Sequence, residues 1–484
     1  MDAVTRRSQR FTGTRSATIV AVTAFAALRL CHIRLLWADE DYHIAAALNI
    51  LHSKLPYRDF WYDKPPLNSL YYLLIGGYAG WPLRLLDTLY VLLVCSLAFR
   101  LARVWWGESE ARVSAFLLAF FLTFYLPSAV IAFAADALMI APHLAAIYYA
   151  FARRAFLAGF YCAVALLINP KALFVLAVCV VWLFPSLPLL SLGFALPLIA
   201  VGALAVLSGS WDGYIEQVWR WGWIYAAQSP VKNPLTTGLI RTLDWLGFHA
   251  VLAGGAAFGL YRVSRKDRWK LGSWLAISFA AVSLGTRFAP HYFLHLLPAM
   301  VIAASRGIVL AWREYRKPAT AFFALALLVP IARFAPRYVS LAYDDLLGRT
   351  PRWTDVVMDL DSRAAAHKIR ASAQPSDTLF VWGYRPDIYV YTRLTSDGKF
   401  WDSQPLTGVP ADRHLHMKDP IYGGPAAQNR QVLVKTRPTW VVDGLGPLNP
   451  NLKPEVYPDL RLWLENYKIV GRTKLSVIYR RLEP

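Results

Sequence analysis

The sequence has little charge and little cysteine. Only 17% of its 484 residues are charged, whereas 56% are hydrophobic. All four cysteines (Cys31, Cys95, Cys162 and Cys179) lie in or beside apolar segments, and their spacing predicts neither a disulfide framework nor a zinc site. The sequence also contains no nucleic-acid-binding motif and no long internal repeat. The missing repeat counts against transporter folds built from duplicated halves.

Long apolar runs recur through the first two thirds of the chain. A helix needs roughly 20 mostly apolar residues to cross a bilayer. About ten such runs in succession indicate a polytopic membrane protein rather than a soluble protein with buried helices. Examples are Ala17 to Leu36, Leu83 to Val104, Leu187 to Leu207 and Ala319 to Ala335.

Basic residues outnumber acidic ones by 51 to 31, which gives a formal net charge of +20. In a soluble protein this excess would suggest nucleic acid. Here the basic residues collect in short loops, which the positive-inside rule places in the cytoplasm. The N-terminal segment, MDAVTRRSQRFTGTRS, lacks a small-residue cleavage site before the first span. We therefore interpret it as a cytoplasmic tail followed by a retained helix.

The basic loops assign an orientation to each span and give about eleven spans, with the C-terminus outside. Pro170 divides residues 155–185 into a helical hairpin because proline interrupts helical hydrogen bonding. Residues 67–80 are too short to span comfortably and are expected to form a helix in the outer interface. The basic residues used are Arg6, Arg7, Arg10, Arg15, Arg100, Arg103, Arg112, Arg153, Arg154, Arg262, Arg265, Lys266, Arg268, Lys270 and Arg306.

The composition changes near residue 336, where apolar runs of spanning length stop. We predict a transmembrane domain over 1–335 and an extracytoplasmic α/β domain over 336–484, because strand-like and helix-like segments alternate there. The expected strands are 378–383, 388–394, 431–436, 439–444 and 475–482, and the expected helices are 355–371 and 458–467.

The predicted first outer loop, residues 37–81, is unusually polar for its position. Its first part carries Asp39, Glu40 and Asp41, which either form a hydrated loop at headgroup level or serve a function. Residues 42–53 have apolar side chains at helical spacing. They predict an amphipathic helix on the outer surface, which would hold the acidic group against the membrane.

The second part of this loop reads YRDFWYDKPPL, in which Lys64 precedes two prolines that stiffen the backbone. A carboxylate and a fixed cation at one membrane face suit the transfer of a sugar from a lipid phosphate. The carboxylate takes the proton of an acceptor hydroxyl, and the cation stabilises the departing phosphate. Asp41, Lys54 and Asp59 are expected to be ordinary surface charges.

The order Asp-Glu, helix, Tyr-Arg-Asp-Phe and Lys-Pro-Pro-Leu resembles bacterial members of the dolichyl-phosphate-mannose protein mannosyltransferase superfamily. These are glycosyltransferase family 39 and the related aminoarabinose transferases that modify lipid A. The resemblance implies a GT-C fold with its active site on the extracytoplasmic side. It also implies a polyprenyl- or dolichyl-phosphate sugar donor, no cofactor and metal-independent chemistry.

The resemblance assigns roles to residues of the first loop. Asp39 matches the catalytic aspartate, Glu40 its acidic companion and Lys64 the phosphate-binding lysine. Glu40 and Asp136 are expected to act in catalysis by orienting the acceptor or the sugar. Asp63 takes the place of the acid before that lysine, and Arg58 of the Tyr-Arg-Asp-Phe motif is assigned to substrate binding.

Further matches lie outside the first loop. Asp136 matches a second outer-loop acid or caps a helix N-terminus, and Lys171 meets lipid phosphate or snorkels to the interface. The stretch TRFAPHYFLHLLPAM, residues 286–300, resembles a late-loop signature whose phosphate-facing residues would be Arg287, His291 and Tyr292. His291 and His295 are four apart and could share a helical face as metal ligands, but a third ligand has no obvious source.

Two other stretches keep two interpretations each. In PSDTLFVWGYRPDIYVYTRL, Trp382, Gly383 and Arg385 either line an acceptor surface or form the core and a turn. Residues 210–230 are rich in tryptophan and tyrosine, which interfacial anchoring explains, with sugar stacking or lipid contact as the second interpretation. Glu216 and Arg220, four apart, are expected to pair on a helix.

The sequence thus predicts a multi-pass glycosyltransferase of the bacterial inner (plasma) membrane. It would move a sugar from a polyprenyl phosphate to a hydroxyl of a lipid, glycan or protein acceptor, with inversion and with Asp39 as general base. The alternatives are a lipid or solute transporter and a non-catalytic subunit of an envelope assembly. Charges clustered at the outer ends of the spans, rather than within them, favour the enzyme.

Overall fold

The computed structural model describes residues 16–126, 132–228, 231–349, 356–416 and 418–482. The chain divides into two compact units. The first, here called the helical unit, comprises residues 1–33, 83–200 and 233–351. The second, called the mixed unit, comprises 34–82, 201–232 and 352–484. The first outer loop therefore groups with the C-terminal residues, and the domain boundary at 335/336 stays a prediction.

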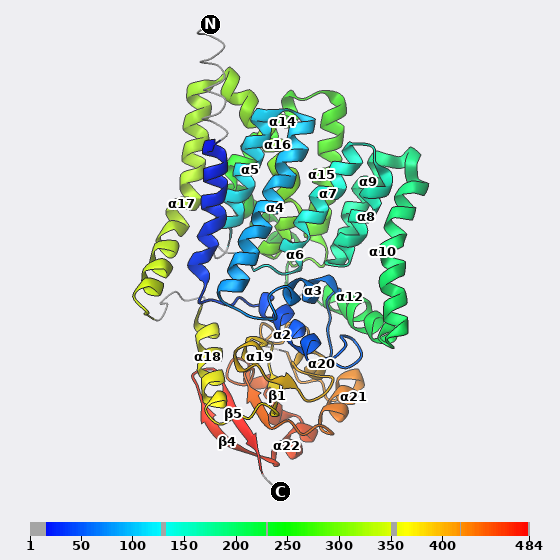
Figure 1. Ribbon diagram of the computed structural model, residues 1–484, viewed down its shortest axis with the longest axis vertical. Helices are drawn as coiled ribbons and strands as arrows, with labels where there is room; N and C mark the ends of the chain where they lie inside the picture. The colour runs from blue at the N-terminus through cyan, green and yellow to red at the C-terminus, as the bar shows by residue number, and fades with distance from the viewer. Residues whose placement is uncertain (1–15, 127–131, 229–230, 350–355, 417, 483–484) are drawn as a thin grey trace. The chain divides into compact units, whose positions relative to one another are not determined.

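The helical unit consists of apolar helices, among which α5, α14 and α16 run side by side (Figure 1). Some helices expose large apolar side chains, for example Leu192, Ile199 and Leu204 of α10. Its helices are 16–32, α4 (Trp81–Trp105), α5 (Glu108–Thr123), α6 (Ala135–Leu138), α7 (Ile140–Phe151), α8 (Ala155–Leu166), α9 (Leu173–Leu183), α10 (Leu187–Leu207), α13 (Pro234–Phe248), α14 (Ala250–Arg262), α15 (Arg265–Ser283), α16 (Leu297–Glu314) and α17 (Arg316–Leu346).

Three helical segments of the described residues are long and apolar enough to cross a membrane: α4, Pro170–Leu207 and α17. A fourth is possible if α13 and α14, which meet at 91°, form one broken span. The chain is thus a helical membrane protein, while the count of eleven spans stays a prediction. Helix α17 continues to Leu346, past its predicted end at 335, although it contains Pro330 and Pro336.

Glycines bring pairs of these helices into backbone contact. A Cβ atom at Gly307 of α16 would lie 1.8 Å from the carbonyl oxygen of Gly255 in α14. A Cβ at Gly159 of α8 would lie 2.0 Å from the carbonyl oxygen of Leu190 in α10. Small residues at such crossings allow the close packing that holds helices together in a membrane.

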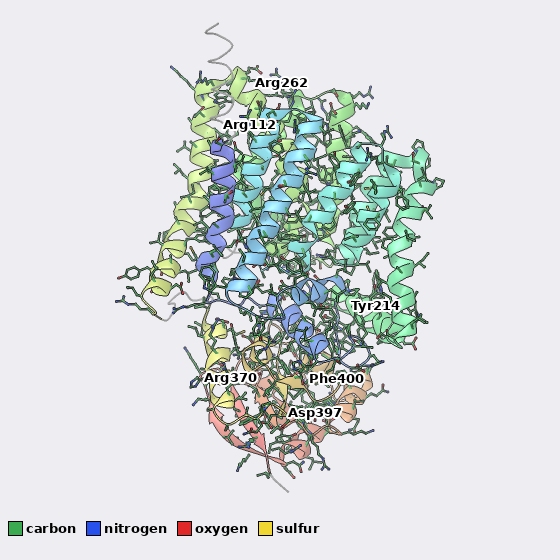
Figure 2. All side chains as sticks on the ribbon, in the orientation of Figure 1. Arg112, Tyr214, Arg262, Arg370, Asp397 and Phe400 are labelled. Atoms are coloured by element: carbon green, nitrogen blue, oxygen red, sulfur yellow. The ribbon has the colours of Figure 1, made fainter. Side chains whose placement is uncertain are left out.

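Charged residues gather at one end of the helical unit. Figure 2 shows Arg112 and Arg262 at this end, whereas α6 lies at the opposite end (Figure 1). Arg262 pairs with Glu314, with a nitrogen–oxygen distance of 2.6 Å. This placement agrees with the predicted shared side for Arg112 and Arg262. The arginines at positions 6, 7, 10 and 15 lie outside the described residues.

The mixed unit contains a five-stranded sheet in the order β2-β1-β3-β5-β4. The strands are β1 (Thr378–Trp382), β2 (Thr395–Ser396), β3 (Trp440–Asp443), β4 (Tyr467–Arg472) and β5 (Val477–Arg481). β1 pairs in parallel with β2 and β3, while β5 pairs antiparallel with β3 and β4. Helices accompany this sheet: α18 (Val357–Arg370), α19 (Asp387–Thr392), α20 (Gln404–Thr407), α21 (Gly424–Leu433) and α22 (Pro458–Leu464). The prediction of a small α/β region is confirmed.

Two of the five predicted strands are wrong. Residues 388–394 lie largely in helix α19, and 431–436 fall at and beyond the end of helix α21. Tyr389 explains the first error, because its hydroxyl makes hydrogen bonds to Val381 and Leu379 of β1 and to Trp401. These contacts outweigh the strand preference of its β-branched and aromatic neighbours. β4 begins at Tyr467, where a helix was predicted to end.

The first outer loop contains α2 (Glu40–Leu51) and α3 (Leu67–Leu73). The prediction of a surface-lying amphipathic α2 is wrong, because ten of its twelve residues, Glu40 to Asn49, are buried. Its polar residues find partners inside the unit, such as the Tyr62 hydroxyl for His43. Asp41, predicted as a surface charge, is buried as well, with 4% of its surface exposed. Lys54 and Asp59 are half-buried.

The third part of the mixed unit is the segment 201–232, which begins within the last turns of α10. It forms α11 (Trp211–Tyr214), a π-helical turn η4 (Ile215–Arg220) and α12 (Trp221–Ala227). Glu216 and Arg220 pair at 2.9 Å on this turn, as predicted.

Candidate functional site

The predicted residues of the first loop form what we call the first-loop cluster: Asp39, Glu40, Asp63 and Lys64. Asp39 is exposed and immediately precedes α2, with φ 78° and ψ −43°. Such a backbone conformation costs a residue other than glycine about 1–3 kcal/mol, and strain of this kind concentrates at functional sites. The Asp39 carboxylate does not cap α2. The Asp39 side chain is thus open to solvent and is not used to cap its own helix.

Glu40 holds the turn that carries Asp39. Its side chain is fully buried, and Oε1 accepts a hydrogen bond of 2.9 Å from the backbone N–H of Trp37. The N–H of Asp41 donates to the carbonyl of Trp37 at 3.1 Å. The sequence predicted a catalytic role for Glu40, and this geometry gives it a positioning contact next to Asp39.

Lys64 and Asp63 form an ion pair, with Nζ 3.0 Å from Oδ2. The Lys64 side chain is 34% exposed and that of Asp63 is 10% exposed. Burial disfavours the charged amine, but the Asp63 carboxylate, with smaller contributions from Tyr225 and Asp39, raises the pKa of Lys64 overall. The Tyr57 hydroxyl donates to the Lys64 carbonyl at 2.8 Å. Lys64 is thus a fixed cation with an accessible side chain.

An aromatic stack that the sequence did not predict supports this cluster. The Tyr42 ring stacks on Tyr62, Tyr384 and Trp401, with centroid distances of 5.4, 5.2 and 4.9 Å. The Tyr42 hydroxyl accepts a long hydrogen bond of 3.4 Å from the N–H of Asp63. The aromatic density of YRDFWYD was a signal for part of the stack, but Tyr384 and Trp401 come from far along the chain.

Two further titratable groups belong to this region. Burial, with a contribution from Lys64, lowers the pKa of His43 to about 3, so His43 is neutral at physiological pH. Its Nδ1 lies 2.6 Å from the Tyr62 hydroxyl. Burial, followed by the Asp63 charge, raises the pKa of Asp402 well above its usual value. Asp402 is only 3% exposed and was not predicted as a site residue.

Arg58 contacts other groups than the Lys64–Asp63 ion pair. Its guanidinium contacts both carboxylate oxygens of Asp59, at 2.8 and 3.0 Å, and the carbonyl of Ser208 at 3.1 Å. The side chain is 48% exposed. These contacts join the first loop to segment 201–232, and a substrate contact by Arg58 stays a prediction.

The helical unit holds a second group, here called the helical cluster: Asp136, Asn169, Lys171, His291 and His295. Asp136 Oδ1 accepts a hydrogen bond of 2.8 Å from Asn169 and lies 3.0 Å from His295 Nε2. Its Oδ2 lies 3.7 Å from His291 Nε2. The N-cap of α6 is Ala134 and makes no side-chain cap. The N-cap interpretation of Asp136 is therefore wrong.

Lys171 lies beside the same group. Its backbone N–H donates to Asn169 Oδ1 at 3.0 Å, and its ammonium is 2.9 Å from the centroid of the Tyr292 ring. Arg287 is close enough to interact electrostatically with Lys171. The backbone carbonyl of Arg287 accepts a hydrogen bond from Arg241.

The helical unit thus brings together all five of its predicted site residues: Asp136, Lys171, Arg287, His291 and Tyr292. Asn169 was not predicted, and His295 was considered only as a metal ligand. Within the described ranges, no group of three or more histidine, cysteine or acidic side chains has the arrangement of a metal site. The sequence feature that could have identified Asn169 was its position directly before Pro170 in the hairpin turn.

The C-terminal residues proposed for an acceptor surface are core residues instead. Trp382 is fully buried, and its indole N–H donates to the carbonyl of Leu452 at 2.9 Å. Arg385 is 1% exposed and pairs with Asp361 at 3.1 Å. Gly383 has a φ of +131°, which explains the glycine at this turn. The core-and-turn interpretation is therefore confirmed.

These features define the class of protein. An apolar helical unit and a mixed unit with a small sheet are the architecture of a GT-C fold, which the solved structures confirm. The chain shares this fold with ArnT from Cupriavidus metallidurans. In the apo state the TM-score is 0.63 and the identity 13%, with 97% of this chain and 98% of that chain covered. With undecaprenyl phosphate bound to ArnT, the TM-score is 0.62 at the same identity and coverage.

Comparison of the amino-acid sequence with known families and proteins identifies no relative. No protein-family model matches this chain, and no curated protein is similar enough to count as a match. At 13% identity the likeness to ArnT establishes the fold.

Proposed function

We propose that this chain is a membrane glycosyltransferase that moves a sugar from a polyprenyl phosphate to an acceptor hydroxyl. The observation that carries the proposal is Asp39, an exposed carboxylate held at φ 78° in the same unit as the Lys64–Asp63 ion pair. The ArnT fold supports the choice of donor, because ArnT binds undecaprenyl phosphate.

Asp39 is the general base in the proposed reaction. Its carboxylate takes the proton of the acceptor hydroxyl while the acceptor oxygen forms a bond to the anomeric carbon. The bond between that carbon and the phosphate oxygen breaks, and polyprenyl phosphate leaves with the electron pair. A single displacement of this kind inverts the anomeric configuration.

Cationic groups stabilise the leaving phosphate in this proposal. Lys64 supplies a fixed ammonium in the mixed unit, and its raised pKa keeps it charged at neutral pH. In the helical unit, phosphate contact is assigned to Lys171, Arg287, His291 and Tyr292. Asp136, joined to Asn169 and His295, positions this second group.

The test compares wild type with Asp39→Asn, both purified in nanodiscs, using radiolabelled polyprenyl-phosphate sugars as donors and envelope lipids and glycans of the host as acceptors. We expect transfer to fall by at least about 100-fold in Asp39→Asn, because general-base catalysis contributes 10²- to 10⁴-fold. Asp419→Asn, which changes an exposed carboxylate of the mixed unit, is expected to leave transfer unchanged.

The product also tests the stereochemistry. NMR of the transferred sugar is expected to show inversion relative to the donor. Transfer by Asp39→Asn at the wild-type rate would show that Asp39 is not the base, and retention would rule out single displacement. Transport is tested in proteoliposomes, because a nanodisc encloses no compartment. Movement of lipid or solute across the proteoliposome membrane without any donor sugar would favour the transporter.

A further inference from the structure

The mixed unit has a pocket of about 500 Å³ that no role described above uses. Five side chains with polar or aromatic groups line it: Trp211, Asp212, Glu216, Arg220 and Lys399. Four of them come from α11 and the π-helical turn η4, and Lys399 comes from the segment before Phe400. Figure 2 labels Tyr214, which lies between the lining residues Gly213 and Ile215, and Phe400, which follows Lys399.

The two walls of the pocket are tied to the first outer loop. Gln217 of η4 is fully buried and spans the loop backbone, with Nε2 2.7 Å from the Tyr57 carbonyl and Oε1 2.7 Å from the Tyr62 N–H. On the other wall, the N–H of Trp61 donates to the carbonyl of Lys399 at 2.6 Å. Gln217 therefore fixes the inner side of η4, and Glu216 and Arg220 are left on its exposed side.

The turn itself is unusual. η4 is a π-helix, and single π-helical turns occur frequently at functional sites. Gly213 fits only as glycine, because a Cβ there would lie 2.2 Å from the Tyr57 carbonyl oxygen. Trp211 and Glu216 line the same pocket. The close approach of α11 to the first loop and the π-helical turn bring them together.

The lining suits a neutral polar ligand with an apolar face. Two acidic and two basic side chains line it, so their formal charges cancel. Glu216 and Arg220 are 51% and 73% exposed although they pair with each other, and they can accept from and donate to hydroxyl groups. Trp211 is 41% exposed and offers an aromatic face for carbon-bound hydrogens. A sugar ring combines these requirements.

We propose that this pocket binds a sugar residue of the acceptor, which is therefore a glycan. The assignment to the acceptor rests on the proposed function. The pocket's attachment to residues 57–62, which lead directly to Asp63 and Lys64, gives a bound glycan a fixed relation to the first-loop cluster. Interfacial anchoring of the same tryptophans in lipid is the competing outcome.

The test measures binding without any donor, so its result does not depend on transfer. Full-length protein in nanodiscs is examined by saturation-transfer NMR with methyl glycosides of glucose, galactose, mannose, arabinose and N-acetylglucosamine. We expect transfer to the ring protons of at least one glycoside in wild type and in Asp39→Asn. We expect this signal to fall to that of empty nanodiscs in Trp211→Ala.

Matched variants separate the pocket from general effects. Trp223→Ala removes another tryptophan of the same segment that is 77% exposed and does not line the pocket, and it is expected to bind as wild type. Trp211→Phe keeps an aromatic face and is expected to retain binding. Asp212→Asn is expected to weaken it, which keeps the proposal testable if Trp211→Ala does not fold.

Several results would overturn the proposal. They are the absence of signal for every glycoside in wild type, an unchanged signal in Trp211→Ala, and an equal loss in Trp223→Ala. Quenching by brominated lipids that falls in Trp211→Phe, without any sugar binding, would identify Trp211 as a lipid anchor instead. Loss of transfer in Asp39→Asn with intact glycoside binding would support both proposals separately.

Discussion

The backbone of Asp39 suggests a function, because it adopts a strained conformation and its side chain makes no capping hydrogen bond to α2 that would offset the strain. Asp39→Gly removes this strain and the carboxylate together. We expect the free energy of unfolding of the protein to rise by about 1 kcal/mol, while transfer is lost. Thermal unfolding in nanodiscs measures the first effect. Asp39→Ala is the control, since it removes the carboxylate but keeps the strained φ, and it should show no gain.

Asn169 joins the carboxylate of Asp136 to the backbone of Lys171. Asn169→Ala removes both hydrogen bonds, of 2.8 and 3.0 Å. A hydrogen bond to a charged group contributes about 1.5–3 kcal/mol, so we expect KM for the polyprenyl-phosphate sugar to rise roughly tenfold, with a smaller change in kcat. Steady-state kinetics measure KM and kcat separately. A pure loss of folded protein with unchanged KM would mean that Asn169 only stabilises the turn.

Asp443 in β3 makes the stability of the mixed unit depend on pH. Burial, aided by Glu455, raises the pKa of Asp443 to about 7, although the N–H groups of Gly446 and Leu445 favour the charged form. In the unfolded chain the pKa is about 3.9. The folded state therefore binds the proton more tightly, so stability is full below pH 4 and is lost as the pH rises to 7.

The corresponding variant is Asp443→Asn, which cannot ionise. In wild type, ionisation of this carboxyl lowers the free energy of unfolding by up to about 1.4 kcal/mol for each pH unit between pH 4 and 7. We expect Asp443→Asn to flatten the dependence of Tm on pH between 4 and 7, and to be the more stable protein at pH 8. The control is Asp419→Asn, which should follow wild type. An unchanged slope in Asp443→Asn would contradict the raised pKa.

The candidate residues that the sequence identified are those within short motifs. Asp39, Lys64, Asp136 and Lys171 each follow from a few neighbouring letters. Their neighbours could not be found this way, because Asp402 and Asp63 interact electrostatically, and His295 contacts Asp136, across segments that are distant in the sequence. Asp41 was misjudged for the same reason, since burial depends on what packs over α2.

At the scale of elements, the crossing of α14 and α16 depends on glycine. Gly255 and Gly259 form a small-xxx-small pattern on α14 opposite Gly307 of α16. Gly307→Val places atoms where the Gly255 carbonyl lies, and overpacking of this kind costs about 1–3 kcal/mol. We expect a lower Tm and less folded protein by size-exclusion chromatography. Gly272→Ala on α15 meets no atom within 4 Å and should be neutral or stabilising.

Elements with strong apolar patterns were predicted well, and those with mixed patterns were not. The spans of α4 and α10 and the strands β1, β3 and β5 follow from runs rich in apolar residues. The sequence of residues 388–394 is as compatible with a strand as with a helix, because its aromatic and β-branched residues are common in sheets. The local sequence does not contain the contacts of Tyr389 that make this segment helix α19.

For the whole molecule, composition and order were sufficient to predict a helical membrane protein with a small α/β region, and the resemblance of its motifs to a known family predicted the GT-C fold. The grouping of the first loop with the C-terminal residues was not predictable from order. It arises from long-range contacts such as Trp401 Nε1 to the carbonyl of Trp61 and the hydrogen bonds of Arg393 to Gly76 and Gly77. Residues adjacent to an apolar span gave no sign that they fold with a sheet more than 300 positions away.

The distribution of charge over the whole chain predicts its orientation in the membrane. Arg112 and Arg262 share one end of the helical unit (Figure 2), and the positive-inside rule places that end in the cytoplasm. Alkaline phosphatase folds only where its disulfides form, outside the cytoplasm. We therefore expect activity from phosphatase fused after Ser210 or after Pro484, and none after Arg268. Fluorescent-protein fusions at the same three points should give the opposite pattern. Phosphatase activity after Arg268 would invert the topology and remove the first-loop cluster from the outer face.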